Sequence, residues 1–298
     1  MSQPVCSRER VKMAIRYCQA DRIPKGEICI DKSIIGDSLK CGEVGFIEEL
    51  QFINKLGLDI YCLGPGYREN PGTLPEPGDV LWPNIKKWVN TGLFCFSILD
   101  GALGWGIRVL GFNRFLTLHH KSPVSFEHFT ERIKNLNIEL SKILIDSGID
   151  GIILADDLAY QKGLLLSPQA IKRFFFPSLA LQVEEISRRK IPVFFHSDGN
   201  INEIVPDIVE MGFNGLHCID AHSGMKVADL QKMYGSKLCL WGDLGAEDLT
   251  RAHSPEYRQK LISSILLAAS EKGYILGTNS GIFKGIDLDG LSCIYKNI

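Results

Sequence analysis

His196 combines a reactive side chain with a position at the end of an apolar segment. It follows the apolar run 191–195 and precedes Ser197, Asp198 and Gly199. A neutral imidazole with a carboxylate two residues away can act as a general base, a hydrogen-bond donor or a metal ligand. A single histidine beside apolar residues is also often structural. Its place at a predicted strand terminus favours the catalytic interpretation, with Asp198 as its partner.

Other acidic and amide side chains follow apolar runs in the same way. Asp157 is predicted to act in catalysis beside His196 and Asp198. His196, Asp198 and Asp220 also form a candidate zinc site, because Zn²⁺ accepts imidazole and carboxylate ligands. The residues predicted to bind the substrate all lie at or just beyond the end of an apolar run: Asp156, Tyr160, Asp220, Trp241, Asn279 and Ser280.

These aspartates have a structural interpretation as well. An aspartate after a strand is a good N-cap for the next helix, because its carboxylate accepts hydrogen bonds from the first backbone amides. This alternative is strongest for Asp31, Asp100 and Asp243. Adjacent side chains at a strand end point in different directions. One of Asp156 and Asp157 can therefore cap a helix while the other faces the site.

The elements that must position these residues alternate between short apolar runs and longer amphipathic segments. This alternation predicts βαβ units and a parallel sheet. Helical spacing of apolar residues is found in 126–147, 168–190 and 256–272. Eight strands are predicted, over 27–30, 59–63, 94–99, 151–154, 192–195, 215–219, 238–241 and 274–277.

The pattern predicts an α/β protein, a (β/α)8 TIM barrel that occupies residues 1–298 as a single domain. In this fold the carboxyl ends of the strands meet at one mouth, where the active site lies. His196 and the other polar residues are expected to converge there. Residues 64–93 are rich in proline and glycine, and we expect them to form a loop insertion over the barrel mouth.

The composition argues against several classes of protein. With 33 basic and 35 acidic residues the net charge is −2, which gives no electrostatic reason to expect binding to nucleic acid or a membrane surface. No apolar run reaches the roughly 18 residues of a membrane span. The N-terminal segment lacks the apolar core of a signal peptide. Nine cysteines without a CxxC pair favour reduced thiols and a cytoplasmic location.

The order of several motifs resembles the uroporphyrinogen decarboxylase superfamily over most of the chain. Ser7-Arg-Glu-Arg-Val and Asp21-Arg-Ile-Pro24 look like the usual opening of these proteins. Ala155-Asp-Asp-Leu-Ala-Tyr160 is similar to the segment around their fourth strand. His196-Ser-Asp-Gly199 and Trp241-Gly-Asp243 follow in the expected order. The resemblance implies a (β/α)8 barrel.

The superfamily divides by chemistry. Its decarboxylases carry an Arg-Gln-Ala-Gly-Arg-Tyr segment that holds substrate carboxylates, whereas this chain has Asp31-Lys-Ser-Ile-Ile after its first predicted strand. Its cobalamin-dependent methyltransferases include thiol-methylating members that bind zinc through a His-x-Cys pair and a distant cysteine. This chain has His196-Ser-Asp198 and Thr278-Asn279-Ser280 there, so both cysteines are replaced. The His-Ser-Asp-Gly form looks more like members that demethylate methoxylated aromatics or related donors.

The resemblance therefore implies a corrinoid-dependent methyltransferase of the O-demethylase kind. It would move a methyl group between a small donor, a methoxylated aromatic or similar compound, and the cobalt of a corrinoid protein. The expected cofactors are this partner-borne corrinoid and zinc, and the expected partners are the corrinoid protein and the methyl donor. Two alternatives stay open. One is decarboxylation of the uroporphyrinogen decarboxylase type, and the other is a non-catalytic barrel that binds a ligand.

Overall fold

A curled parallel sheet forms the centre of the molecule. The computed structural model describes residues 5–67, 72–269 and 272–298. Within these residues the sheet has seven strands in the order β1-β4-β5-β8-β9-β10-β11. They are β1 (Ile60–Leu63), β4 (Phe94–Asp100), β5 (Gly151–Ala155), β8 (Val193–His196), β9 (Gly215–Ile219), β10 (Cys239–Leu244) and β11 (Tyr274–Thr278). Seven of the eight predicted strands are thereby confirmed.

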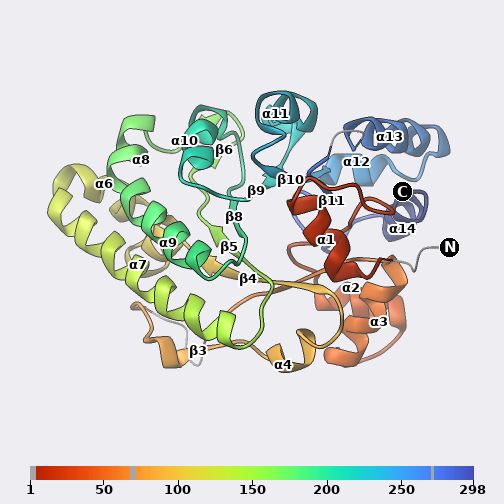
Figure 1. Ribbon diagram of the computed structural model, residues 1–298, viewed down its shortest axis with the longest axis horizontal. Coiled ribbons are helices and arrows are strands. Elements are labelled where there is room, and N and C mark those ends of the chain that lie inside the picture. Colours follow the sequence, from red (N-terminus) through yellow and green to blue (C-terminus); the bar gives the residue numbers. More distant parts are fainter. Residues whose placement is uncertain (1–4, 68–71, 270–271) are drawn as a thin grey trace.

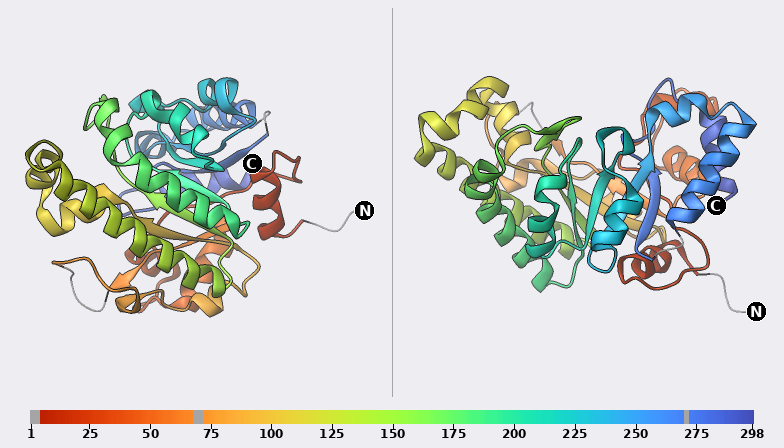
Figure 2. Two further views of the ribbon diagram at one scale, coloured as in Figure 1. Left: turned by 60° about the vertical axis from the view of Figure 1, so that its left-hand side comes forward. Right: turned by 90° about the horizontal axis from the view of Figure 1, so that it is seen from above.

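These strands are continuous apolar runs because both faces of the sheet are covered. Helices pack around the outside of the sheet (Figures 1 and 2). The concave interior is filled by side chains such as Ile60, Phe96, Ile153, Phe194 and Trp241. The interior is therefore a packed core below the carboxyl ends of the strands, and ligand chemistry is confined to those ends.

The helices that cover the sheet follow the strands along the chain. They are α1 (Ser7–Ile15), α2 (Lys32–Leu39), α3 (Phe46–Leu56), α4 (Ile85–Trp88), α5 (Ala102–Leu110), α6 (Phe112–Lys121), α7 (Pro123–Asp146), α8 (Pro168–Phe174), α9 (Phe176–Arg188), α10 (Val205–Glu210), α11 (Val227–Tyr234), α12 (Ala246–Arg251), α13 (Pro255–Ala268) and α14 (Leu288–Lys296). The predicted helix 168–190 is divided at Phe175, just before the proline of the first turn of α9. Residues 270–271 of the predicted helix 256–272 lie outside the described part.

The strand prediction was wrong for 27–30, which does not form a regular strand of the sheet. The segment 24–31 lies between β11 and β1, but it makes only two isolated bridges, Lys25 to Leu276 and Ile30 to Ile282. The amide of Asp59 donates to the carbonyl of Lys25 at 2.7 Å. A complete eight-stranded barrel is therefore not shown. In Figure 1 the N-terminal and C-terminal parts of the chain lie side by side where this segment meets β11.

The side chains of this segment explain why it does not form a regular strand. Pro24 has no amide to donate to a ladder. Lys25 and Glu27 are buried and bind away from β1. The Lys25 ammonium donates to the carbonyl of Tyr295, and Glu27 accepts from the hydroxyls of Thr278 and Tyr295. These contacts hold the segment to β11 and α14 rather than to β1.

Residues 64–93 form the connection between two parallel neighbours, β1 and β4. Such a connection must return to the opposite end of the sheet. It contains the short antiparallel pair β2 (Gly66–Tyr67) and β3 (Val80–Leu81), and then α4. Its beginning lies at the carboxyl end of β4, where the Tyr67 hydroxyl is 3.3 Å from Asp100. Residues 68–71 of the predicted insertion, including Pro71, lie outside the described part.

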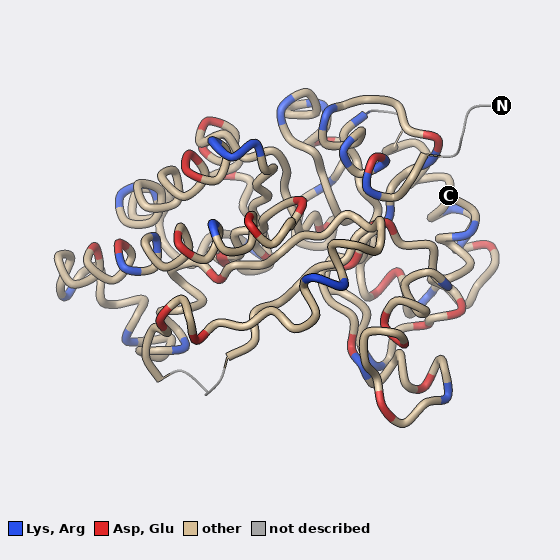
Figure 3. The backbone as a smooth tube through the Cα atoms, turned by 60° about the horizontal axis from the view of Figure 1, so that its bottom comes forward, with Lys and Arg blue, Asp and Glu red and all other residues tan. Residues whose placement is uncertain are grey.

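In the described part of the chain, no helix has the length and apolarity needed to cross a bilayer. Figure 3 shows acidic and basic residues interspersed along the backbone. This distribution agrees with the small net charge of −2.

Candidate active site

His196 lies at the carboxyl end of β8 between two carboxylates. Its Nε2 is 3.6 Å from Oδ1 of Asp157 and 4.0 Å from Oδ1 of Asp198. The backbone amide of Asp198 donates to Oδ1 of Asp157 at 3.0 Å, which ties the two loops together. One ligand atom from each of the three residues lies within 4.8 Å of the others. The structure thus brings together the three residues predicted to be catalytic, which we call the His196 cluster.

The other ring nitrogen of His196 faces a second histidine. Nδ1 of His196 is 2.8 Å from Nδ1 of His217, which lies opposite it on β9. His217 is fully buried, and burial, followed by the nearby His196, holds the pKa of His217 well below its usual range. His217 is therefore neutral. The sequence placed His217 within the predicted strand 215–219, but this placement did not show that the two rings meet.

Asp198 is affected by several charged neighbours. Desolvation raises the pKa of its carboxyl, His196 acts in the opposite direction, and Asp157 raises it further. The thiol of Cys218 adds a hydrogen bond that favours the carboxylate. The cluster therefore combines one imidazole with two carboxylates whose mutual repulsion is relieved by a proton or a cation.

Asp220 does not complete the predicted zinc set. Its Oδ1 accepts from the amide of His222 at 3.0 Å, and its Oδ2 accepts from the hydroxyl of Ser223 at 2.6 Å. Both oxygens thus stabilise the turn that follows β9. In the structure it is Asp157 that joins His196 and Asp198 as the third potential ligand.

Asp156 has a structural position, in contrast to its neighbour Asp157. Its carboxylate is buried and accepts from the amides of Ala102 at 3.1 Å and Leu103 at 2.7 Å, at the start of α5. Burial raises the pKa of this carboxyl to about 7. This arrangement matches the alternative interpretation of the pair, in which one aspartate caps a helix and the other faces the site.

The remaining predicted substrate residues are not part of the His196 cluster. Trp241 is buried in the sheet interior, where its Nε1 donates to the carbonyl of Gly26 at 3.1 Å and its ring packs edge-on against His217. Tyr160 is 51% exposed on β6 (Ala159–Tyr160), which pairs with β7 (Gly163–Leu164). Asn279 is half-buried and Ser280 exposed, just after β11.

The hairpin that carries Tyr160 rests on the loop that follows His196. The amide of Asn200 donates to the carbonyl of Tyr160 at 2.9 Å. Gly199 has a φ of 85°, and a Cβ there would lie 2.6 Å from the Tyr160 backbone. Glycine is needed here for both reasons. Tyr160 is therefore positioned at the rim of the site through its backbone.

The three aspartates for which the sequence most favours a helix cap differ from one another in the structure. Asp31 caps α2, since it accepts from the amide of Ser33 at 2.8 Å. Asp100 instead pairs with Arg108 at 2.8 Å. Asp243 has a φ of 93°, and desolvation raises its pKa to about 6. The cap of α12 is made by Gly245 and Asp248, so the cap prediction was wrong for Asp243.

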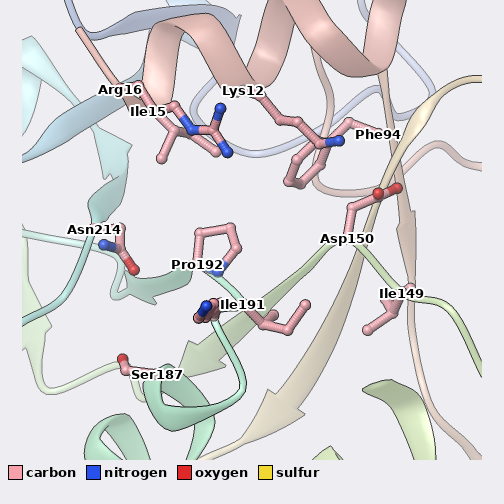
Figure 4. A pocket seen from close by; sticks show the side chains of 11 residues that line it. Lys12, Ile15, Arg16, Phe94, Ile149, Asp150, Ser187, Ile191, Pro192 and Asn214 are labelled. Atoms are coloured by element: carbon pink, nitrogen blue, oxygen red, sulfur yellow. The ribbon is translucent and has the colours of Figure 1, made fainter. Parts of the chain in front are cut away.

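A separate cavity of about 500 Å³ lies at the other end of the sheet. Its walls include Phe94, Asp150, Pro192 and Asn214, which stand at the amino ends of their strands (Figure 4). Ile191 also lines it. This cavity contains none of the His196 cluster, and in this fold the amino ends of the strands serve stability rather than catalysis.

Comparisons with known proteins agree with the barrel-like architecture. No curated protein sequence matches the chain. A methyltransferase from Methanosarcina mazei has a similar structure, with a TM-score of 0.75 and 16% identity over 98% of both chains. A B12-independent methionine synthase from Shewanella sp. W3-18-1 has a TM-score of 0.55 and 14% identity over 92% of this chain and 94% of its own. At these identities the likeness shows the fold alone.

The sequence itself carries the stronger relationship. Residues 105–297, more than half of the chain, match the family model described as Uroporphyrinogen decarboxylase (URO-D). The matched part includes all three residues of the His196 cluster, and it confirms the resemblance noted from the motifs. The chain belongs to the uroporphyrinogen decarboxylase family.

Proposed function

We propose that this protein is a methyltransferase that moves a methyl group between a small donor and the cobalt of a corrinoid carried by another protein. The observation that carries the proposal is the His196 cluster at the carboxyl ends of the strands. Membership of the family and the fold shared with the Methanosarcina mazei methyltransferase support it. The donor we favour is a methoxylated aromatic or a similar compound.

The chemistry needs help at the oxygen that loses its methyl group. As the methyl carbon passes to cobalt, the carbon–oxygen bond breaks and the oxygen keeps the bonding electrons. A phenolate is a poor leaving group unless it gains a proton or binds an electrophile. One well-placed general acid is typically worth about 10²–10⁴ in rate. In our proposal His196 gives this proton from Nε2, with Asp198 and Asp157 beside it.

The contact with His217 leaves Nε2 of His196 for the cluster. When His196 is protonated, its Nδ1 donates to the neutral His217, and its Nε2 proton is the one that the leaving oxygen takes. When His196 is neutral and donates from Nδ1, its Nε2 has a free lone pair and faces the two carboxylates. In that form the cluster fits zinc, which takes nitrogen and oxygen ligands. The hydrogen bond to His217 would then orient the ring of His196 as a zinc ligand.

His196, Asp157 and Asp198 would hold the zinc ion, in place of the predicted set with Asp220. Bound there, zinc would supply Lewis-acid stabilisation of the leaving oxygen. The role of the protein residues is the same in both forms. They hold one electrophilic group at the carboxyl ends of the strands, where a donor and a corrinoid can approach it.

Decarboxylation of a porphyrinogen has less support. Such a substrate carries eight carboxylates and needs cations around it. The charged side chains beside Nε2 of His196 are two carboxylates, and Arg108 on α5 is paired with Asp100.

The test is a methyl-transfer assay with the full chain. The protein is incubated with cobalt(I) cobalamin and a panel of methoxyaromatic and methylamine compounds, and methyl-cobalt absorbance is followed. We expect turnover with at least one methoxyaromatic compound. His196→Ala should abolish it with little change in thermal stability, and His253→Ala, at an exposed histidine just after α12, should not. Absence of methyl-cobalt with every compound would refute the proposal.

A further inference from the structure

A cavity of about 200 Å³ lies where the sheet is incompletely paired. We call it the seam cavity, and its walls include Ile28, Cys29, Ile30, Ile60, Cys62 and Ile98. The Asp59 amide joins β1 to the segment 24–31 through Lys25. In the described part of the chain, no backbone hydrogen bond joins residues 26–31 to β1 beyond that point. The missing ladder leaves the space that the cavity fills.

The seam cavity runs from the interior of the sheet to its outer layer. Cys62 and Ile98 pack on the interior core. Ile35 and Ile53, which also line the cavity, belong to α2 and α3 outside the sheet. The cavity is therefore a gap through the wall and not a pocket between surface helices.

The gap reaches the carboxyl end of β1, because Gly64, the residue after this strand, lines it. Cys29 lies within electrostatic range of Asp198, whose charge is among the causes, after desolvation and Glu27, that raise the pKa of the Cys29 thiol. Cys29 also lies against the turn after β11, where its Sγ is 3.6 Å from the carbonyl of Ser280. A ligand in the seam cavity thus has one edge directed toward the carboxyl ends of the strands.

We propose that the seam cavity binds the aromatic ring of the methyl donor, with the methoxy group directed to the His196 cluster. This inference rests on the proposed function. An apolar cavity of about 150 Å³ is large enough for benzene. A volume of about 200 Å³ therefore suits one benzene ring with a small substituent. The aliphatic and thiol side chains of the wall suit the faces of an apolar ring.

The charges at the wall select against acidic rings. At the outer end Glu49 accepts from the Tyr61 hydroxyl at 2.7 Å and pairs with Lys32 at 3.1 Å. Lys32 is thereby neutralised. Glu27 lines the same cavity. The structure thus assigns neutral methoxyphenols and methoxybenzenes, rather than methoxybenzoates, as ligands.

The first test measures binding without cobalamin, by calorimetry with 2-methoxyphenol and 4-methoxybenzoate. Ile98→Phe fills the seam cavity, and we expect it to weaken 2-methoxyphenol binding at least about tenfold, or 1.4 kcal/mol. Ile191→Phe makes the same change at another half-buried isoleucine, in the cavity at the opposite end, and should leave binding unchanged (Figure 4). The benzoate should bind more weakly than the phenol. Equal effects of the two variants, tighter benzoate binding, or no binding to the wild-type protein would overturn the inference.

The second test uses the wild-type protein and does not depend on how a variant folds. Thiol alkylation is followed by mass spectrometry with and without 2-methoxyphenol. Cys29 and Cys62, which line the seam cavity, should be protected, and the exposed Cys18 should not. Protection of all three or of none contradicts the inference. Protection without methyl transfer would leave the cavity assignment standing and refute the proposed function.

Discussion

His217 shows how one buried side chain can set the chemistry of another. It is neutral, and its Nδ1 meets Nδ1 of His196 at 2.8 Å. Because both rings share one proton in this contact, His217 fixes which nitrogen of His196 is left for the cluster. The sequence placed His217 inside a strand but did not show the register that puts it opposite His196. That register comes from the parallel pairing of β8 with β9.

We therefore expect His217→Phe to lower methyl transfer by about 10- to 100-fold, the usual effect of removing an outer hydrogen bond to a catalytic or ligating histidine. The rate constant kcat should fall while KM for the donor stays nearly constant. His119→Phe is the matched control, because His119 is another buried histidine and lies on α6. Equal losses in the two variants would mean that His217 is only a packing residue.

Glu27 makes stability depend on pH. Burial raises the pKa of its carboxyl from about 4.5 to about 7. The folded state therefore binds a proton more tightly than the unfolded state. The resulting stabilisation is complete below about pH 4.5 and is lost as the pH rises to about 7. Its size is on the order of 3 kcal/mol, since each tenfold change in proton affinity corresponds to about 1.4 kcal/mol.

Urea unfolding at about pH 5 and about pH 8 tests this expectation. Wild-type protein should lose more stability over this interval than Glu27→Gln. Asp156 and Asp243, whose pKa values are also raised, contribute equally to both proteins. The same pH dependence in both would show that Glu27 does not change its protonation on folding.

At the scale of single elements, two adjacent aspartates at the end of β5 have different roles, one in stability and the other in the proposed active site. Asp156 binds two amides at the start of α5, while Asp157 is mostly exposed and faces His196. We expect Asp156→Ala to cost about 1–3 kcal/mol of unfolding free energy, because the buried amide of Leu103 and the partly buried amide of Ala102 lose their acceptor. Asp157→Ala should change stability by less than about 0.5 kcal/mol.

Activity should show the opposite order, with the larger specific loss in Asp157→Ala when both variants are assayed below their unfolding temperatures. Equilibrium unfolding and the methyl-transfer assay together make the comparison. A stable, fully active Asp157→Ala protein would remove Asp157 from the site.

The strand predictions succeeded where burial on both faces leaves a continuous apolar run, as in β5, β9 and β11. They failed at 27–30, because the buried Lys25 and Glu27 bind β11 and α14, which are remote in sequence. No local pattern encodes those partners. The division of 168–190 into two helices had a local signal in Pro177, which lies in the first turn of α9.

At the scale of the whole molecule, the sheet is weakly paired between 24–31 and β1. Amides with few backbone hydrogen bonds open locally at low free-energy cost. In hydrogen-exchange mass spectrometry we therefore expect peptides covering 27–30 to exchange faster than those of β9. Exchange at 27–30 should slow with 2-methoxyphenol if the ring binds in the seam cavity. Equally slow exchange in both segments would show that the sheet is uniformly closed.

The contact of the segment 24–31 with β11 also has a consequence for how the chain folds. Thr278 and Glu27, which are hydrogen bonded, are 251 positions apart in sequence. Contacts between such distant residues form late and slowly. During synthesis the segment 24–31 emerges from the ribosome long before β11, and its partners on β11 and α14 are missing until those elements have emerged. Throughout that interval the backbone groups at the edge of β1 are unpaired. A chaperone can bind this edge, or neighbouring nascent chains can aggregate through it.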